Sequence, residues 1–216
     1  MTNQLGSELE LKEENDYYNR KLLQRIADRE ELESHLRRVI ELLGYDPEDQ
    51  HFKRTPIRVA QVVRLFESHG SFEEADATAG KLLDVQFDEE HNSMVVVGPI
   101  TFRSMCAHHF LPVLGKAWVG YIPDGRVCGL SKLARVVHFY AQQFTVQERV
   151  TQQIANLIND CLQPLGVGVI VQAVHGCMSH RGVMEPDAET STSAVRGVFL
   201  KEPGVREEFM RLSKGL

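Results

Sequence analysis

The chain has 216 residues, which suits one domain with a terminal extension or a small domain that oligomerises to bury its core. Its hydrophobic fraction of 43% and charged fraction of 25% are ordinary for a soluble globular protein. The net charge of -6 argues against broad nucleic-acid binding, and no apolar run approaches the roughly 20 residues that span a bilayer. The acidic stretch from Glu8 to Glu14 is unlike a signal peptide. We therefore expect a cytoplasmic protein that binds neither nucleic acid nor membranes.

The N-terminal part of the chain is expected to be helical. Residues 1–16 are polar and are expected to lack fixed structure. Apolar residues at helical spacing predict a helix from Tyr17 to Leu43. Thr55-Pro56 suits the N-cap and first turn of another helix that ends near Gly70. The small, acidic stretch from Ser71 to Gly80 is expected to form either a short helix or a loop.

Strand patterns follow. Short strand candidates are Ser93–Val97 and Ile100–Arg103, and longer ones are Leu111–Ile122, Val167–Cys177 and Ser191–Leu200. Two amphipathic helices are expected between the long strands. Ser131 is placed to cap the first, and Thr145 with Glu148 forms a possible capping box for the second. A last amphipathic helix is predicted over Pro203–Leu212. This order predicts an α+β fold in which an antiparallel sheet, preceded by N-terminal helices, is covered by helices on one face.

Two short motifs indicate a metal site. Cys106-Ala107-His108-His109 and the distant His175-Gly176-Cys177 offer two thiolates and an imidazole to one zinc ion. If Val167–Cys177 is a strand, His175 and Cys177 face the same side. Three protein ligands leave one position open, as in catalytic rather than structural zinc sites, and the two spare histidines are suited to proton transfer. The other two cysteines, Cys128 and Cys161, have apolar neighbours and are interpreted as packing residues.

Several motifs stand in the order found in one enzyme family. They are Cys106–Phe110, Gly129-Leu130-Ser131-Lys132, Val146-Gln147-Glu148-Arg149, and His175-x-Cys177-Met178 followed by Arg181-Gly182-Val183. With these motifs the chain resembles GTP cyclohydrolase I from about Thr55 to its C-terminus. The resemblance implies an N-terminal segment with helices over residues 1–54 and a catalytic domain over residues 55–216. It also implies the tunnelling fold, whose sheets join between subunits into an oligomeric barrel, and a homodecamer with active sites between subunits.

The activity implied by the resemblance is a zinc-dependent hydrolysis. Such enzymes open the imidazole ring of the guanine of GTP, release C8 as formate and form 7,8-dihydroneopterin triphosphate, a precursor of pterins and tetrahydrofolate. By resemblance, Cys106, His109 and Cys177 hold Zn²⁺, which activates the water that attacks C8. His108 would protonate the purine ring, and His175 would serve the later proton transfers.

The resemblance also implies a set of substrate-binding residues. Gln147 and Glu148 match the pair that reads guanine, although Glu148 in a capping box is the alternative. Arg58 resembles a phosphate-binding arginine contributed by a neighbouring subunit. The positions that match binders of the triphosphate and ribose are Ser131, Lys132, Arg135 and Arg181. For these the alternative is a solvated basic helix face.

The chain departs from the family pattern at three places. Ala107 stands where a glutamate is usual, Gln142-Gln143-Phe144-Thr145 lacks a usual basic residue, and His180 precedes Arg181 where a neutral residue is common. These departures leave two alternatives open. One is a related enzyme that acts on another purine or pterin, and the other is a zinc-stabilised subunit without catalytic activity.

Overall fold

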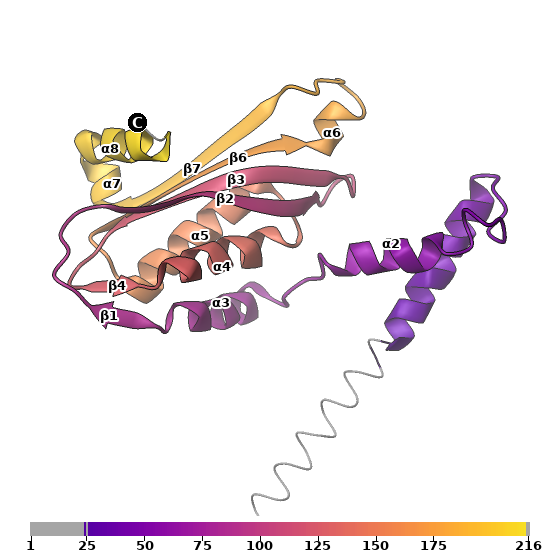
Figure 1. The fold of residues 1–216 in the computed structure, drawn as a ribbon, viewed down its shortest axis with the longest axis horizontal. Coiled ribbons are helices and arrows are strands. Elements are labelled where there is room, and N and C mark those ends of the chain that lie inside the picture. Colours follow the sequence, from indigo (N-terminus) through magenta and orange to yellow (C-terminus); the bar gives the residue numbers. More distant parts are fainter. Residues whose placement is uncertain (1–23, 25, 215–216) are drawn as a thin grey trace, which may run out of the picture. The chain divides into compact units, whose positions relative to one another are not determined.

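The computed structural model describes residue 24 and residues 26–214, and the expectation for residues 1–16 lies outside them (Figure 1). The chain divides into two compact units, one ending at Leu65 and the other beginning at Phe66. Among the residues described, no helix has the length and apolarity of a membrane span. The domain boundary expected between residues 54 and 55 stays a prediction.

The N-terminal unit contains a helix over residues 26–42 and helix α2 (Thr55–Arg64). Helix α2 ends at Arg64, earlier than expected, and its N-cap is Arg54 rather than Thr55. The Thr55 hydroxyl instead donates a hydrogen bond to the carbonyl of His51 in the preceding turn, at 3.3 Å. It therefore does not cap α2.

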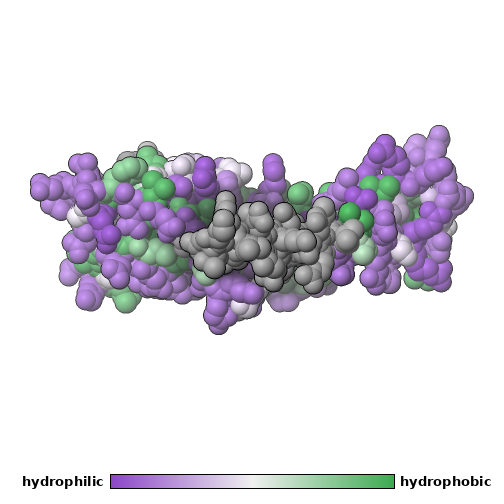
Figure 2. All heavy atoms as spheres, turned by 90° about the horizontal axis from the view of Figure 1, so that it is seen from below, coloured by the Kyte–Doolittle hydropathy of each residue, from purple (hydrophilic) through white to green (hydrophobic). Residues whose placement is uncertain are grey.

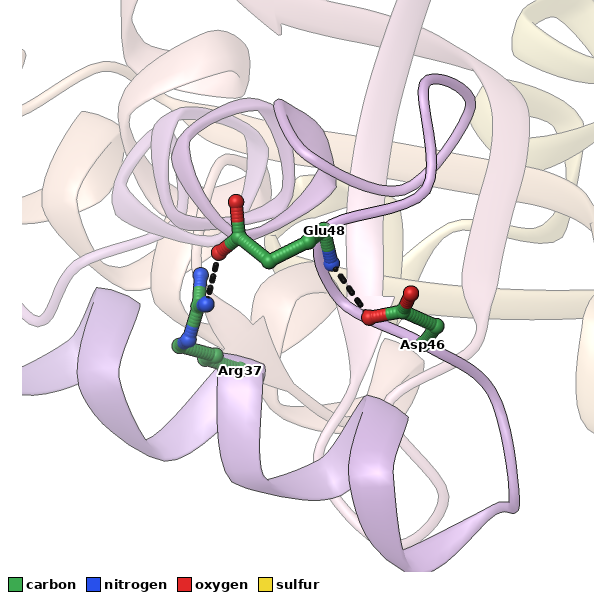
Figure 3. A network of polar contacts seen from close by, with 3 residues as sticks. All are labelled: Arg37, Asp46 and Glu48. Carbon is green, nitrogen blue, oxygen red and sulfur yellow. Dashed lines mark hydrogen bonds and ion pairs between the residues drawn. The ribbon is translucent and has the colours of Figure 1, made fainter.

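A small polar network orders the turn before α2. The Asp46 carboxylate accepts a hydrogen bond of 2.9 Å from the backbone N–H of Glu48, and Arg37 pairs with the Glu48 carboxylate (Figure 3). The hydrogen bond from Arg37 lowers the pKa of Glu48. Both side chains of this ion pair are exposed, so the pair adds little to stability.

Large apolar side chains are exposed on the N-terminal unit. Apolar spheres emerge there within a mostly hydrophilic surface (Figure 2). The side chains exposed by 49% or more are Val39, Leu42, Leu43, Tyr45, Val62 and Leu65. Within the unit these side chains are not buried by other residues, whereas soluble proteins rarely leave so many large apolar side chains exposed together.

The second unit is built on a five-stranded sheet in the order β5-β2-β3-β6-β7. Strand β5 runs parallel to β2, and every other neighbouring pair is antiparallel. The strands are β2 (Val95–Cys106), β3 (Pro112–Ile122), β5 (Phe144–Thr145), β6 (Gly166–His175) and β7 (Glu189–Gly197). A separate antiparallel pair consists of β1 (Gln86–Asp88) and β4 (Arg126–Cys128).

Helices cover one face of the sheet and part of the other (Figure 1). The helices of this unit are α3 (Phe72–Gly80), the 3₁₀ turn η1 (Lys81–Leu83), α4 (Leu130–Ala141), α5 (Gln147–Leu162), α6 (Gly176–Ser179), α7 (Val198–Lys201) and α8 (Pro203–Ser213). Helices α4 and α5 lie on the face where the main core forms. Fully buried side chains such as Val119, Val169, Leu133 and Ile154 meet there. The expected α+β architecture is confirmed.

A glycine pair lets the C-terminal helices approach the opposite face. Gly120 of β3 pairs with Gly168 of β6 and alternates with the core valines, so both glycines point away from α4 and α5. A Cβ atom at Gly120 would lie 2.8 Å from the Phe209 ring, and one at Gly168 would lie 2.6 Å from Phe199. The sequence analysis expected helices on one face only, and this second contact was not anticipated.

Several predicted element bounds were wrong. The two short strands around Gly98-Pro99 form one strand, β2, with an irregular register between Val97 and Ile100. The last predicted strand ends at Gly197, and α7 follows it. The open alternative over Ser71–Gly80 resolves as helix α3, whose N-cap Ser71 forms a capping box with Glu74.

Candidate active site

Three potential metal ligands converge at one end of the sheet. A ligand atom of each of Cys106, His109 and Cys177 lies within 4.8 Å of the other two. Cys106 Sγ and His109 Nδ1 are 3.7 Å apart. Zinc bonds of about 2.3 Å to sulfur and 2.0 Å to nitrogen place tetrahedral ligands about 3.5 Å apart, so this separation fits zinc closely. Two sulfurs and one imidazole are also the donor types that zinc prefers.

The turn between β2 and β3 brings two of these ligands together. Cys106 is the last residue of β2, and the turn returns at once to β3 with Phe110 in the left-handed region at a φ of 55°. The Phe110 N–H donates to the Cys106 carbonyl, and the Cys106 N–H donates to the Leu111 carbonyl, both at 2.9 Å. This closed turn brings His109 back toward Cys106.

Cys177 reaches the same place by a route that the sequence analysis did not predict. Strand β6 ends at His175, and Cys177 lies in the one-turn helix α6 rather than in a strand. The chain leaves the strand at Gly176, where a Cβ atom would lie 2.9 Å from the Pro112 carbonyl oxygen. His175 and Cys177 still border one cavity, but the helical turn rather than strand alternation places them there.

A cavity of about 230 Å³ opens beside the candidate ligands. Its polar lining includes His108, Glu148 and His175, together with the two cysteine ligands. Its apolar lining consists of Phe102, Val113, Val146, Val150, Val171 and Met178. The cavity therefore places two imidazoles and a carboxylate next to a metal site, within a largely apolar wall.

Local electrostatics favour neutral groups in this cavity. Burial lowers the pKa of His175, while the Glu148 carboxylate raises it. Burial raises the pKa of the Cys177 thiol, and a hydrogen bond with Cys106 raises it further. Metal binding needs both thiols deprotonated, so a cation at this place would displace their protons.

At the start of helix α5, Gln147 is buried and Glu148 is exposed. Val146 is the N-cap of α5, and no side chain caps the helix, so the alternative of a capping box between Thr145 and Glu148 is wrong. Glu148 is exposed in the first helical turn. The Gln147 side chain is 6% exposed and hydrogen-bonds to His175.

The expected phosphate-binding residues divide into two groups. Arg181 contacts His109 Nε2 and so lies at the metal ligands. Ser131, Lys132 and Arg135 lie in the first turns of α4, and none of them lines the cavity. Ser131 is the second residue of α4, and Gly129 takes the N-cap position predicted for it. The end of α4 that leads to the cavity is the opposite one, about 18 Å away for a helix of 12 residues.

Arg58 stands on the exposed surface of α2 in the N-terminal unit and is not among the residues that line the cavity. Its role stays a prediction. Sequence reasoning missed two features of the site: the requirement for glycine at position 176, and the contacts of the Gln147 amide. Neither leaves a signal in spacing or hydrophobic pattern, because each depends on strands that pair over long range.

The fold and this constellation are those expected of an enzyme with a candidate metal site of thiols and an imidazole at one end of a sheet. Comparison with known proteins identifies the family: the profile of GTP cyclohydrolase I matches residues 32–214, and the chain belongs to that family. Its fold is therefore the tunnelling fold expected from the resemblance.

Curated relatives agree with the family profile. GTP cyclohydrolase 1 of Aquifex aeolicus is 44% identical over 88% of this chain and 98% of its own length. GTP cyclohydrolase 1 of Homo sapiens is 44% identical over 81% of this chain and 68% of its own. Among solved structures, the archaeosine synthase QueF-Like in the apo form is 17% identical, with a TM-score of 0.39 over 49% of this chain and 92% of its own. The chain is thus an enzyme of the GTP cyclohydrolase I family.

Proposed function

We propose that this chain hydrolyses GTP at C8 of the guanine ring, releasing formate and forming 7,8-dihydroneopterin triphosphate, in the cytoplasm. The observation that carries the proposal is the cavity in which His108, His175 and Glu148 border the Cys106, His109 and Cys177 cluster. That cavity combines metal ligands, two proton-transfer groups and a carboxylate suited to guanine.

Zinc is the metal that we propose for the cluster. The donor set and the 3.7 Å separation between Cys106 Sγ and His109 Nδ1 support this choice. When bound, zinc would lower the pKa of a coordinated water and so supply a nucleophile at neutral pH. Cys106, Cys177 and the Nδ1 atom of His109 would hold it.

The two remaining imidazoles would move protons. His108 lies in the exposed turn after Cys106, with its ring centroid 6.2 Å from that of His109. We assign to His108 the protonation of the purine ring as C8 is attacked. His175 borders the same cavity, where burial lowers its pKa and so favours the neutral imidazole. A neutral imidazole can accept a proton, which suits the later steps of the rearrangement.

Guanine recognition falls to Glu148 in this proposal. Its carboxylate can accept hydrogen bonds from N1–H and the exocyclic amine of guanine together, a pair of donors that adenine lacks. The predicted contact of guanine with Gln147 stays a proposal as well.

The positions of the expected phosphate-binding residues support an oligomer. Arg181 stands at the metal ligands, but Ser131, Lys132 and Arg135 lie toward the far end of α4. If these three residues bind the triphosphate, as the family resemblance implies, they must serve the cavity of a neighbouring copy. We therefore propose a homo-oligomer, and a decamer as the assembly expected from the family. Arg58 would also act in a neighbour's site.

The first test is turnover by the zinc-loaded full chain, followed through formate and oxidised neopterin. We expect both products from the wild type and a loss of about 10²- to 10⁴-fold in kcat for His108→Ala with zinc content unchanged. His91→Ala, at an exposed loop histidine outside the cavity, is the matched control and should keep wild-type activity. Absence of both products from the wild type would refute the proposal.

A second test addresses guanine recognition. Glu148→Gln keeps the size of the side chain but replaces one acceptor oxygen by a donor, so we expect KM for GTP to rise about 10-fold or more. Glu189→Gln, at an exposed residue of β7 that does not line the cavity, is the control. An unchanged KM for Glu148→Gln would remove Glu148 from guanine binding.

Ala107 favours one alternative. The family's usual glutamate is absent from the turn that carries His108, so a related purine or pterin is the second candidate substrate class. A competition assay decides between them: a purine or pterin that is turned over faster than GTP would support this alternative.

A further inference from the structure

The Gln147 side chain is locked in one orientation by its surroundings. Its Nε2 atom lies 3.1 Å from the Val171 carbonyl oxygen, 2.9 Å from the Thr190 carbonyl oxygen and 3.1 Å from Thr192 Oγ1. Backbone carbonyls only accept hydrogen bonds, so the amide nitrogen must be the atom that faces them. The Gln147 amide oxygen must then point the other way.

A second layer of contacts supports this orientation. The Thr151 hydroxyl donates its single hydrogen to the backbone carbonyl oxygen of Gln147 at 2.8 Å. In the 2.7 Å contact between the Thr151 and Thr192 hydroxyls, Thr192 is therefore the donor. The lone pairs of Thr192 then remain available to accept from the Gln147 amide. Each donor in this buried network thus has an acceptor.

The orientation of Gln147 determines the hydrogen on His175. The Gln147 amide oxygen lies 2.7 Å from His175 Nε2, and an amide oxygen can only accept. His175 Nε2 must therefore carry a hydrogen in both the neutral and the protonated imidazole. The second ring nitrogen, Nδ1, has no hydrogen-bond partner among the described residues, and His175 borders the cavity.

We propose that Gln147 is a positioning residue: its amide oxygen fixes the orientation of the His175 ring and holds it as the Nε2–H tautomer, with the lone pair of the imidazole on Nδ1. This inference deepens the proposed function and rests on it for the role of His175 in proton transfer.

The test reads the tautomer directly. Full-length protein labelled with ¹⁵N-histidine is studied by solid-state NMR at pH 8, and His175→Asn identifies the His175 signals. We expect wild-type His175 to show a protonated Nε2 and an unprotonated Nδ1. Gln147→Leu should introduce the Nδ1–H tautomer at His175. Gln172→Leu is the matched control, because Gln172 of β6 also donates a hydrogen bond from its amide to a hydroxyl of β7, that of Ser191. This variant should leave the His175 signals unchanged.

Kinetics give a second readout. For Gln147→Leu we expect kcat to fall about 10- to 100-fold while KM for GTP stays within about twofold, since the lost contact orients a proton-transfer group rather than the substrate. A raised KM with unchanged kcat would instead assign Gln147 to substrate binding and overturn the inference. Thr192→Val, which removes only one acceptor of the Gln147 amide, should give an intermediate loss of kcat.

The two proposals fail in different ways. A wild-type His175 with hydrogen on Nδ1 alone, or an unchanged spectrum in Gln147→Leu, would overturn the positioning role even if GTP is turned over. Wild-type protein that shows the expected tautomer but makes no formate would overturn the proposed function and leave the tautomer assignment standing. If Gln147→Leu does not fold, the wild-type spectrum and Thr192→Val still decide the question.

Discussion

Gly176→Ala is the sharpest test of how the site is assembled. The added Cβ would lie 2.9 Å from the Pro112 carbonyl oxygen and 3.2 Å from Leu111 Cβ. The nearer atom belongs to the backbone of β3, so it cannot rotate away as a side chain would, and α6 must shift by a few tenths of an ångström. Metal–ligand distances vary by only about 0.2 Å, so the Cys177 thiolate would bind the proposed zinc poorly or not at all.

Two quantities should change together in this variant. We expect zinc affinity, measured by chelator competition on the full chain, to fall about 10- to 100-fold. The free energy of unfolding of the metal-free protein should fall by about 1 to 3 kcal/mol, as for other overpacked positions. Gly204→Ala is the control, because a Cβ there meets nothing within 4 Å. Wild-type zinc affinity and unfolding in Gly176→Ala would refute the argument that close packing at this glycine positions Cys177.

Two further predictions concern stability. Burial raises the pKa of Tyr121 to about 12, so between pH 10 and 12 the tyrosine of the unfolded chain loses its proton first and the folded wild type loses about 2 to 3 kcal/mol of stability. Urea unfolding, followed by Trp118 fluorescence at pH 9 and 11.5, should show a smaller loss of stability for Tyr121→Phe. Equal losses in the two proteins would contradict the raised pKa. In a double-mutant cycle, Gly120→Ala and Phe209→Ala should each lower the free energy of unfolding. The double variant should lose at least about 1 kcal/mol less than the sum of the two single losses, because truncating Phe209 removes the ring that a Cβ at Gly120 would meet. Additive losses would show that Phe209 does not contact this position.

Local patterns predicted much of this fold. The long strand beginning near Leu111 and the helix beginning at Pro203 are present with almost the expected bounds, since hydrophobic periodicity and proline act within a few residues. The three candidate ligands also come together as their donor types and the family resemblance predicted, although Cys177 lies in α6 rather than in the expected strand. The resemblance to a family then predicted the class of enzyme.

Features that depend on distant segments were not predictable in the same way. Ser131 was expected to cap a helix, but the chain enters α4 from β4 through Gly129, which changes where the helix begins. Cys177 was expected in a strand, yet the packing of Gly176 on Pro112 turns the chain into α6. The network around Gln147 joins α5, β6 and β7, and no local pattern records such a meeting.

The division of the candidate metal ligands between the β2–β3 turn and α6 has a consequence for biosynthesis. Cys106 and His109 leave the ribosome together, but Cys177 follows only after α4, α5 and β6 have been made. A nascent chain therefore offers two ligands for a long interval and acquires the third only when β6 can pair with β3. Loading of the proposed metal would thus come late in the folding of the chain, after most of its sheet has formed.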